Sequence, residues 1–347
     1  MRRVFNIVVV VPAVLAFTLE VWAQSAAFTQ AMQLFQQHRW AEAAAAFAEC
    51  EKNEPGKTEA LLYRGKSLVN LGRWQDAAGA LQAYRQTHPQ SDDAVYLLAY
   101  VRFREDKPQE SLPLFTEAAK LRTPTSDDLK IVALDYVLLN DYDDAAHYLE
   151  VALRMDPANV EARYHLGRVR YQQNRFDLAI EAFQEVLSKD PGNVKAQDNL
   201  GLSLDAENKT DEAIAAYRKA IALDSGAAIH NEQPYLNLGA LFAKSNRPEE
   251  AVPLLTRASE IAPKSAKPRY ELGKAYFDLN RLEPAQREAE QAVLLEPGDK
   301  SSHYLLGRIY QRQGKTRLAE EQFRKTENLI HDSDAKPSSG MGPGINH

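Results

Sequence analysis

Residues 160–191 read VEARYHLGRVRYQQNRFDLAIEAFQEVLSKDP, and altered copies of this segment recur along the chain. Its apolar and small residues are spaced as on one face of a helix, first at Leu166 and Gly167 and then at Ala179, Phe183 and Val186. The polar pair Asn174-Arg175 separates the two halves, Pro191 closes the segment, and neither half alternates with the period of a strand. We therefore expect two antiparallel helices joined by a tight turn.

Three series of residues repeat along the chain with a common step of 34 residues. Small residues form the first series, at Ala43, Ala77, Ser111, Ala145, Ala179, Ala213, Ala251, Ala285 and Ala319. The second and third series are Gly65, Gly167, Gly201, Gly239, Gly273 and Gly307, and Pro55, Pro89, Pro157, Pro191, Pro263 and Pro297. All three contain four extra residues at the same place, around Ala228–Asn231, so the pattern is not accidental.

Nine repeats result, covering residues 24–330 and beginning at residues 24, 58, 92, 126, 160, 194, 232, 266 and 300. Within a repeat, Gly or Ala at position 8 and Ala at position 20 let the two helices approach closely, while larger residues at positions 7, 11 and 24 fill the surrounding space. Proline at position 32 disfavours helix in the residue before it, so one helix pair ends and the next begins. A single pair cannot bury its apolar face alone, so we expect the pairs to stack around a continuous core.

This spacing of small, aromatic and proline residues resembles the tetratricopeptide repeat family over about residues 24–330, and the seventh repeat shows it at Leu238, Gly239, Phe242, Ala251, Ala258 and Pro263. The resemblance implies an all-α fold, a right-handed α-solenoid or superhelix of tandem antiparallel helix pairs. It also implies a concave groove that binds an extended peptide or a helix of a partner protein. The resemblance does not specify a biological role, because many unrelated functions share this fold.

Two repeats match the family pattern less well. The third has Pro108 at the entrance of its second helix, Ser111 where Ala is usual, and its closing Pro124 one place late. The first has His38 at its turn and no Gly at position 8. The resemblance therefore defines the geometry of these two repeats less well than that of the others.

Positions 2, 5, 6, 9, 12 and 13 of the first helix lie opposite the core face, and in the family this second face lines the groove. The candidate binding residues are Tyr96, Tyr100, Arg104, Tyr164, His165, Arg168, Asn199, Asn237, Tyr270, Lys274, Tyr304 and Arg308. Tyr and Arg are favoured interface anchors because they combine large area with directed hydrogen bonds. The alternative is that these side chains pack between neighbouring first helices.

Asn199 and Asn237 both occupy position 6, in neighbouring repeats. A side-chain amide donates and accepts, so two amides in register could bind a peptide backbone independently of its sequence. The family's carboxylate clamp needs Lys and Asn on one helix, Asn on the next, and Lys and Arg on the third. Only part of that set follows Asn199, so we do not predict the clamp.

Residues 1–23 have the layout of a secretory signal peptide. Arg2 and Arg3 precede an apolar run that ends near Thr18, shorter than the about 20 residues of a typical transmembrane helix. Small residues precede a cleavage site between Ala23 and Gln24. We therefore expect a secreted or periplasmic protein without stable membrane insertion after cleavage, the alternative being that the segment stays as an uncleaved anchor.

Two further segments depart from the repeats. The four extra residues around Ala228–Asn231 equal about one helical turn, so they either lengthen a helix or loop out. The tail, residues 331–347, is rich in Ser, Gly, Pro and Asp, and we expect it to be disordered.

The sequence offers no constellation for catalysis or metal binding. Its eight His residues form no H-E-x-x-H pair, and it has neither a phosphate-binding nor a dinucleotide-binding Gly-rich loop. Its single cysteine, Cys50, excludes an intrachain disulfide and a Cys-rich metal site, and the net charge of -6 argues against general nucleic-acid binding. We expect a protein that is not an enzyme and has no cofactor, metal or nucleic-acid partner.

Two hypotheses of function follow from a signal sequence followed only by repeats. The first is a non-catalytic protein-interaction scaffold of the periplasm or cell envelope, acting in the assembly of envelope complexes. The second is a carrier of a non-protein envelope ligand such as a polysaccharide, bound by the Tyr and Arg side chains of the groove.

Overall fold

The computed structural model describes residues 26–226 and 230–335, and these residues form helices and connecting turns without a strand. The predicted signal peptide, residues 1–23, lies outside the described residues. The chain divides into two compact bodies, Met1–Pro157 and Ala158–His347, here called the N-terminal and the C-terminal body. None of the helices in the described part of the chain is long and apolar enough to cross a membrane.

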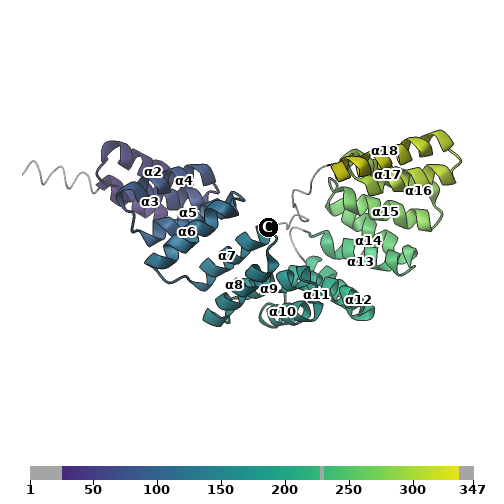
Figure 1. Ribbon diagram of the computed structural model, residues 1–347, viewed down its shortest axis with the longest axis horizontal. Helices are drawn as coiled ribbons and strands as arrows, with labels where there is room; N and C mark the ends of the chain where they lie inside the picture. Colours follow the sequence, from purple (N-terminus) through teal and green to yellow (C-terminus); the bar gives the residue numbers. More distant parts are fainter. Residues whose placement is uncertain (1–25, 227–229, 336–347) are drawn as a thin grey trace, which may run out of the picture. The chain divides into compact units, whose positions relative to one another are not determined.

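The N-terminal body contains the first four helix pairs (Figure 1). A helix over residues 26–36 comes first. It is followed by α2 (Trp40–Asn53), α3 (Glu59–Asn70), α4 (Trp74–Thr87), α5 (Asp92–Arg104), α6 (Pro108–Leu121), α7 (Ser126–Leu138) and α8 (Tyr142–Met155).

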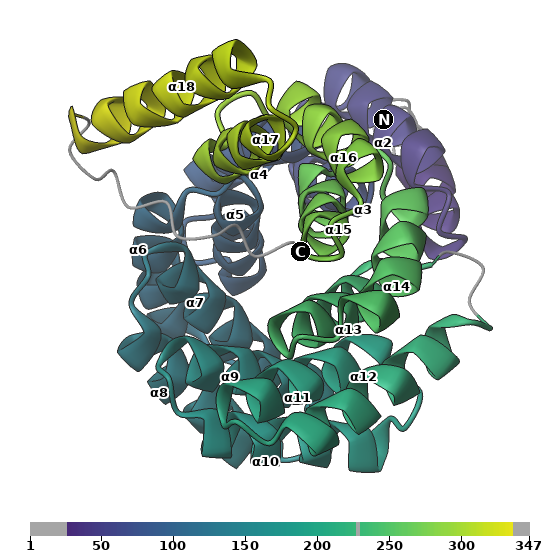
Figure 2. The same ribbon diagram turned by 90° about the vertical axis from the view of Figure 1, so that its right-hand side faces the viewer.

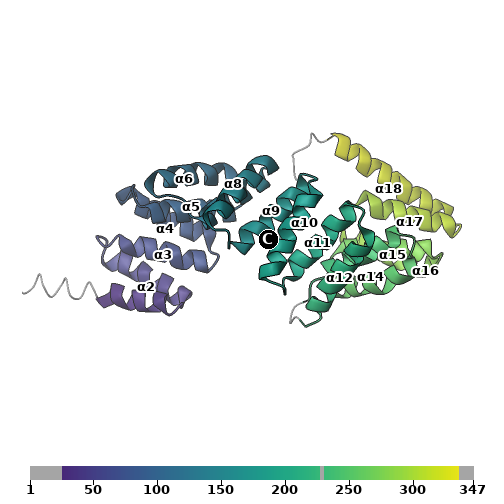
Figure 3. The same ribbon diagram turned by 90° about the horizontal axis from the view of Figure 1, so that it is seen from below.

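The C-terminal body contains the other five helix pairs, which Figures 2 and 3 show from two further sides. They are α9 (Val160–Gln172), α10 (Phe176–Lys189), α11 (Val194–Ala206), α12 (Thr210–Asp224), α13 (Gln233–Lys244), α14 (Pro248–Ile261), α15 (Ala266–Asp278), α16 (Leu282–Leu295), α17 (Lys300–Arg312) and α18 (Thr316–Ala335). The predicted all-α fold of tandem helix pairs is thus confirmed.

Every helix pair turns on one residue with a left-handed backbone. The φ angles at these turns are His38 58°, Gly72 68°, Asp106 55°, Asn140 59°, Asn174 57°, Asn208 60°, Asn246 56°, Asn280 55° and Gly314 74°. All nine occupy position 15 of their repeat. Gly, Asn and Asp tolerate this conformation better than other residues, which explains the polar turn that the sequence repeats. His38 takes the same conformation, so the first repeat turns like the others.

The two helices of a pair meet where the sequence places its smallest residues. A Cβ atom built on Gly201 of α11 would lie 2.7 Å from the ring of Tyr217 on α12. The same overlap occurs at Gly167, whose Cβ would lie 2.8 Å from the ring of Phe183. Tyr217 and Phe183 are each 1% exposed, so these rings fill the space that the missing side chain leaves. The predicted close approach at position 8 is confirmed.

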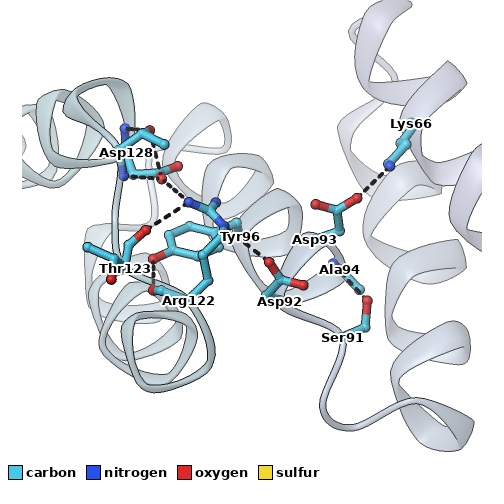
Figure 4. A network of polar contacts seen from close by, with 10 residues as sticks. Lys66, Ser91, Asp92, Asp93, Ala94, Tyr96, Arg122, Thr123 and Asp128 are labelled. Carbon is cyan, nitrogen blue, oxygen red and sulfur yellow. Dashed lines mark hydrogen bonds and ion pairs between the residues drawn. The ribbon is translucent and has the colours of Figure 1, made fainter.

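A polar network spans the connection between α6 and α7, where the closing proline, Pro124, comes one place late (Figure 4). Arg122 Nε donates to Asp92 Oδ2 and its Nη1 donates to Asp128 Oδ2, both at 3.1 Å. The guanidinium carbon lies 3.9 Å from the centroid of the Tyr96 ring, and the Tyr96 hydroxyl donates to the Arg122 carbonyl at 3.0 Å. This network joins the third and fourth repeats, where Pro124 comes late.

A carboxyl group of α7 is buried near Ser111 of α6, away from the connection between these helices. Asp135 of α7 is 0% exposed, and neither of its carboxylate oxygens has a hydrogen-bond partner among the described residues. The nearby Ser111 hydroxyl donates instead to the Ala99 carbonyl, at 2.9 Å. Burial raises the pKa of the Asp135 carboxyl to about 7, and the Ser111 hydroxyl opposes this only weakly.

The four extra residues do not lengthen α12 by a helical turn. Helix α12 has 15 residues and ends at Asp224, whereas the second helices of the neighbouring pairs, α10 and α14, have 14 each. Asp224 is 1% exposed, and its Oδ1 accepts a hydrogen bond from the backbone N–H of Asn231 at 2.8 Å. Residues 227–229 lie outside the described residues.

The last helix extends further than the sequence predicts. Helix α18 continues to Ala335, so the first five residues of the predicted tail, 331–335, belong to a helix. The remaining tail residues, 336–347, lie outside the described residues.

Candidate functional site

The first helices of the repeats form a layer of their own within each body. In the C-terminal body, α9, α11, α13, α15 and α17 each contact the next, and in the N-terminal body α3 contacts α5 and α5 contacts α7. No second helix from α2 to α18 contacts another second helix. The first helices therefore lie closer together than the second helices, and the predicted binding positions lie on this inner layer.

In the C-terminal body these positions form a continuous series, here called the inner strip. Its members are Tyr164, His165 and Arg168 on α9, Asp198, Asn199 and Asp205 on α11, Asn237 and Lys244 on α13, Tyr270, Glu271 and Lys274 on α15, and Tyr304, Arg308 and Arg312 on α17. Most are partly or fully exposed, whereas the opposite faces of the same helices are buried.

The two asparagines do not act as the free pair that the sequence suggests. Asn199 Nδ2 donates to the Tyr164 hydroxyl at 3.1 Å and to the Lys195 carbonyl at 2.8 Å. Asn237 Nδ2 donates to both carboxylate oxygens of Asp198, each at 3.1 Å. Both Nδ2 groups thus already donate within the protein, and the binding of a peptide backbone by the two amides stays a prediction.

Asp198 is a buried carboxyl group on the inner strip. It is 7% exposed, and burial raises the pKa of this carboxyl to about 7, while the hydrogen bond from Asn237 lowers it. The neighbouring carboxylate of Asp205 pairs with Lys244 at 3.2 Å. Contacts between residues 39 positions apart could not be read from the sequence.

Arginine side chains stand at both ends of the inner strip. On α9, the guanidinium carbon of Arg168 lies 5.9 Å from the centroid of the Tyr164 ring, and His165 makes an edge contact with the same ring. On α17, the guanidinium carbons of Arg308 and Arg312 lie 4.7 and 5.3 Å from the centroid of the Phe277 ring.

The other predicted residues on α15 and α17 differ in how exposed they are and in whether their charge is compensated. Tyr304 is 51% exposed. Tyr270 is partly buried, and burial raises the pKa of its hydroxyl. Lys274 Nζ lies 3.9 Å from Glu271 Oε2, so its charge is partly compensated.

The predicted residues of the N-terminal body differ in exposure: one is buried between helices and another lies at the surface. Tyr96 is 6% exposed and belongs to the network around Arg122, so it packs between helices instead of presenting a free surface. Arg104 is exposed, donates to the Tyr100 hydroxyl at 2.9 Å and lies 4.5 Å from the centroid of the Trp74 ring. Trp74 begins a second helix, whereas the family pattern places the groove on first helices, so the sequence did not indicate it.

The described part of the chain contains no group of three or more His, Cys, Asp or Glu side chains that could hold a metal ion. Cys50 is 1% exposed, and burial raises the pKa of its thiol, which makes it a packing residue rather than a nucleophile. The inner strip therefore offers hydrogen bonds, charge and aromatic area for binding.

Sequence comparison identifies the repeats. Family models described as tetratricopeptide repeat match residues 28–92, 64–125, 133–194, 170–228 and 199–266, a further one matches residues 242–309, and another matches residues 301–326. No curated protein sequence matches the chain.

Solved structures share the fold at low sequence identity. A tetratricopeptide repeat protein from Parabacteroides merdae is 19% identical over 73% of this chain and 98% of its own, with a TM-score of 0.59. The APC/C hetero-tetramer Cut9-Hcn1 is 16% identical over 82% of this chain and 55% of its own, with a TM-score of 0.58. Yeast Tom70 is 20% identical over 86% of this chain and 62% of its own, with a TM-score of 0.56.

Tetratricopeptide repeats are non-catalytic modules for protein interaction. The matched segments extend from residue 28 to residue 326 with a single gap, residues 126–132. The chain belongs to the tetratricopeptide repeat family.

Proposed function

We propose that this protein is a scaffold of the periplasm or cell envelope that binds an extended segment or a helix of partner proteins on the inner layer of its bodies. The observation that carries the proposal is the inner strip itself. Side chains such as Tyr304, Arg308 and Arg168 occupy positions that the packing of the repeats does not require, and they are of the types favoured at protein interfaces.

A protein segment suits this layer better than a polysaccharide. Sugar binding would use open aromatic faces, and several rings of the inner layer are already in contact with a cation. Phe277 is 6% exposed and has Arg308 and Arg312 beside it, while Tyr100 has Arg104. Guanidinium groups and amide oxygens, by contrast, match the carboxylates and N–H groups of a peptide.

The proposed location rests on the first 23 residues, which have the layout of a signal peptide. Residues 1–30 fused to a phosphatase that is active only after export provide the test. Phosphatase activity is expected from this fusion, and not when Val9 and Val10 are replaced by Lys. An inactive fusion contradicts the proposed location but not the binding face.

A photo-crosslinking amino acid placed at Tyr304 tests the binding face in the full chain. The matched control carries the same group at Arg287, an exposed position of the second helix α16. Partner proteins are expected to crosslink to position 304 and not to position 287. Equal crosslinking at the two positions contradicts the assignment of the inner layer as the binding face.

A further inference from the structure

Three arginines lie on α9, and two of them have acceptors within the protein. Arg163 Nη1 lies 2.5 Å from Glu185 Oε2, and Arg170 Nη1 donates to Gln173 Oε1 at 2.8 Å. Arg168 forms no ion pair or hydrogen bond with any residue in the described ranges, and its guanidinium carbon lies 5.9 Å from the centroid of the Tyr164 ring.

Arg168 is nevertheless partly buried, and burial lowers the pKa of its guanidinium. Partial removal of a guanidinium from water without an acceptor costs free energy, because its N–H donors lose part of their hydration. Two polar groups of the inner strip have other partners: the Tyr164 hydroxyl accepts from Asn199, and Asp198 accepts from Asn237. The inner strip thus holds a partly desolvated cation whose donors are all uncommitted.

We propose that Arg168 binds the carboxylate of a single Asp or Glu side chain in the segment that occupies the inner strip. This inference rests on the proposed function, since it names the chemistry of the partner at that face. The planar guanidinium matches a carboxylate with two parallel N–H···O hydrogen bonds, and such charge-assisted bonds are stronger where water is partly excluded.

Helix α11, next to α9, disfavours the binding of a partner segment that has several acidic residues in succession. Asp198 and Asp205 both lie on the inner face of α11, one held by Asn237 and the other paired with Lys244. At a pH above the pKa of Asp198, a second carboxylate of the partner crossing α11 would meet these like charges, which costs binding free energy. The expected segment therefore has one acidic residue at Arg168 and neutral residues where it crosses α11.

Selection of random twelve-residue peptides displayed on phage tests the inference on the full mature chain. Peptides joined to the coat protein through their C-termini have no free terminal carboxylate, so only side-chain carboxylates can be selected. Enriched peptides are expected to share one Asp or Glu. Arg168→Gln is expected to recover them about tenfold less, whereas Arg163→Gln, the same charge change on the same helix, recovers them like the wild type.

A double-mutant cycle with one selected peptide separates a direct contact from a structural effect. Replacing the acidic residue of the peptide by Gln or Asn is expected to weaken binding about tenfold to the wild type and less than about twofold to Arg168→Gln, as measured by calorimetry. Circular dichroism verifies that the variant is folded, and Arg168→Lys is expected to bind with intermediate affinity.

Each other result has a distinct meaning. Peptides without a shared acidic residue, peptides with acidic runs, or equal binding to Arg168→Gln overturn the carboxylate assignment and leave the proposed function standing. If no peptide is enriched over the bare support, the proposed function fails, and the inference fails with it.

Discussion

Single glycines determine how closely the two helices of a repeat pack. Gly201→Ala would place a methyl group 2.7 Å from the ring of Tyr217, which is 1% exposed and cannot move aside. The overlap costs about 1–3 kcal/mol and outweighs the gain in helix propensity of about 1 kcal/mol. Gly201→Ala is therefore expected to lower the midpoint of urea unfolding.

The matched control for this substitution is Gly79→Ala. Gly79 is exposed in the interior of α4, and a Cβ there would meet nothing within 4 Å. The substitution is expected to stabilise the protein by about 0.5–1 kcal/mol, because only the helix propensity changes. Destabilisation of both variants by similar amounts would contradict the role given to Gly201.

The carboxyl group of Asp135 makes stability depend on pH. Its pKa in the folded protein is about 7, above the ordinary value of 3.8, so the folded state binds the proton more tightly than the unfolded state. This contribution to stability is complete below about pH 4 and is lost as pH rises through about 7. Asp135→Asn is therefore expected to gain stability relative to the wild type as pH increases from 4 to 8.

The size of that relative gain is on the order of 3 kcal/mol. Urea unfolding of both proteins at pH 4, 6 and 8 measures it. Parallel pH profiles of the two proteins would show that the Asp135 carboxyl is not the titrating group.

The helical elements could be predicted from the sequence, but several contacts between them could not. Position 15 repeats Asn, Asp or Gly in eight of nine copies, so the turns were visible from local residue preferences. The engagement of Asn199 with Tyr164, by contrast, joins side chains 35 residues apart. The sequence places both residues on the inner layer, but the direction of an amide donor is determined by the packing of two helices.

The contacts at the connection between α6 and α7 could not be predicted from the sequence either. The late Pro124 indicates an irregular junction, but it does not indicate that Arg122 joins Asp92 to Asp128. This network depends on the stacking of the Arg122 guanidinium on Tyr96, which only the folded chain brings together.

Arg122→Met is expected to loosen this junction, because it removes two ion pairs and leaves two carboxylates without their cation. Amide hydrogen exchange in α6 and α7 is expected to become faster, with a loss of about 1–3 kcal/mol. The control is Arg73→Met, which removes the exposed ion pair between Arg73 and Asp76 and is expected to cost less than about 1 kcal/mol. Equal changes in exchange for the two variants would contradict a special role for Arg122.

At the scale of the whole molecule, the two bodies are expected to fold independently. The N-terminal body contains four helix pairs and the C-terminal body five, each with its own buried clusters. Three or more stacked repeats generally suffice for a stable core. Fragments 24–157 and 158–347, expressed separately, are therefore each expected to unfold cooperatively, as measured by the circular dichroism of helices during heating.

The sum of the two fragment spectra is expected to reproduce the spectrum of residues 24–347. A fragment that becomes helical only when mixed with the other would contradict independent folding.

The nine turn residues are 34 residues apart at every step except the one from Asn208 to Asn246, and this spacing affects how a gene of this kind can change in length. A crossover between two copies of the repeat adds or removes 34 codons and still joins matching halves, so the turn and the close helix contact are preserved. A crossover that spans residues 225–231 changes the length by 38 codons instead, because that copy carries four more. Recombination can therefore lengthen or shorten the inner layer by whole helix pairs.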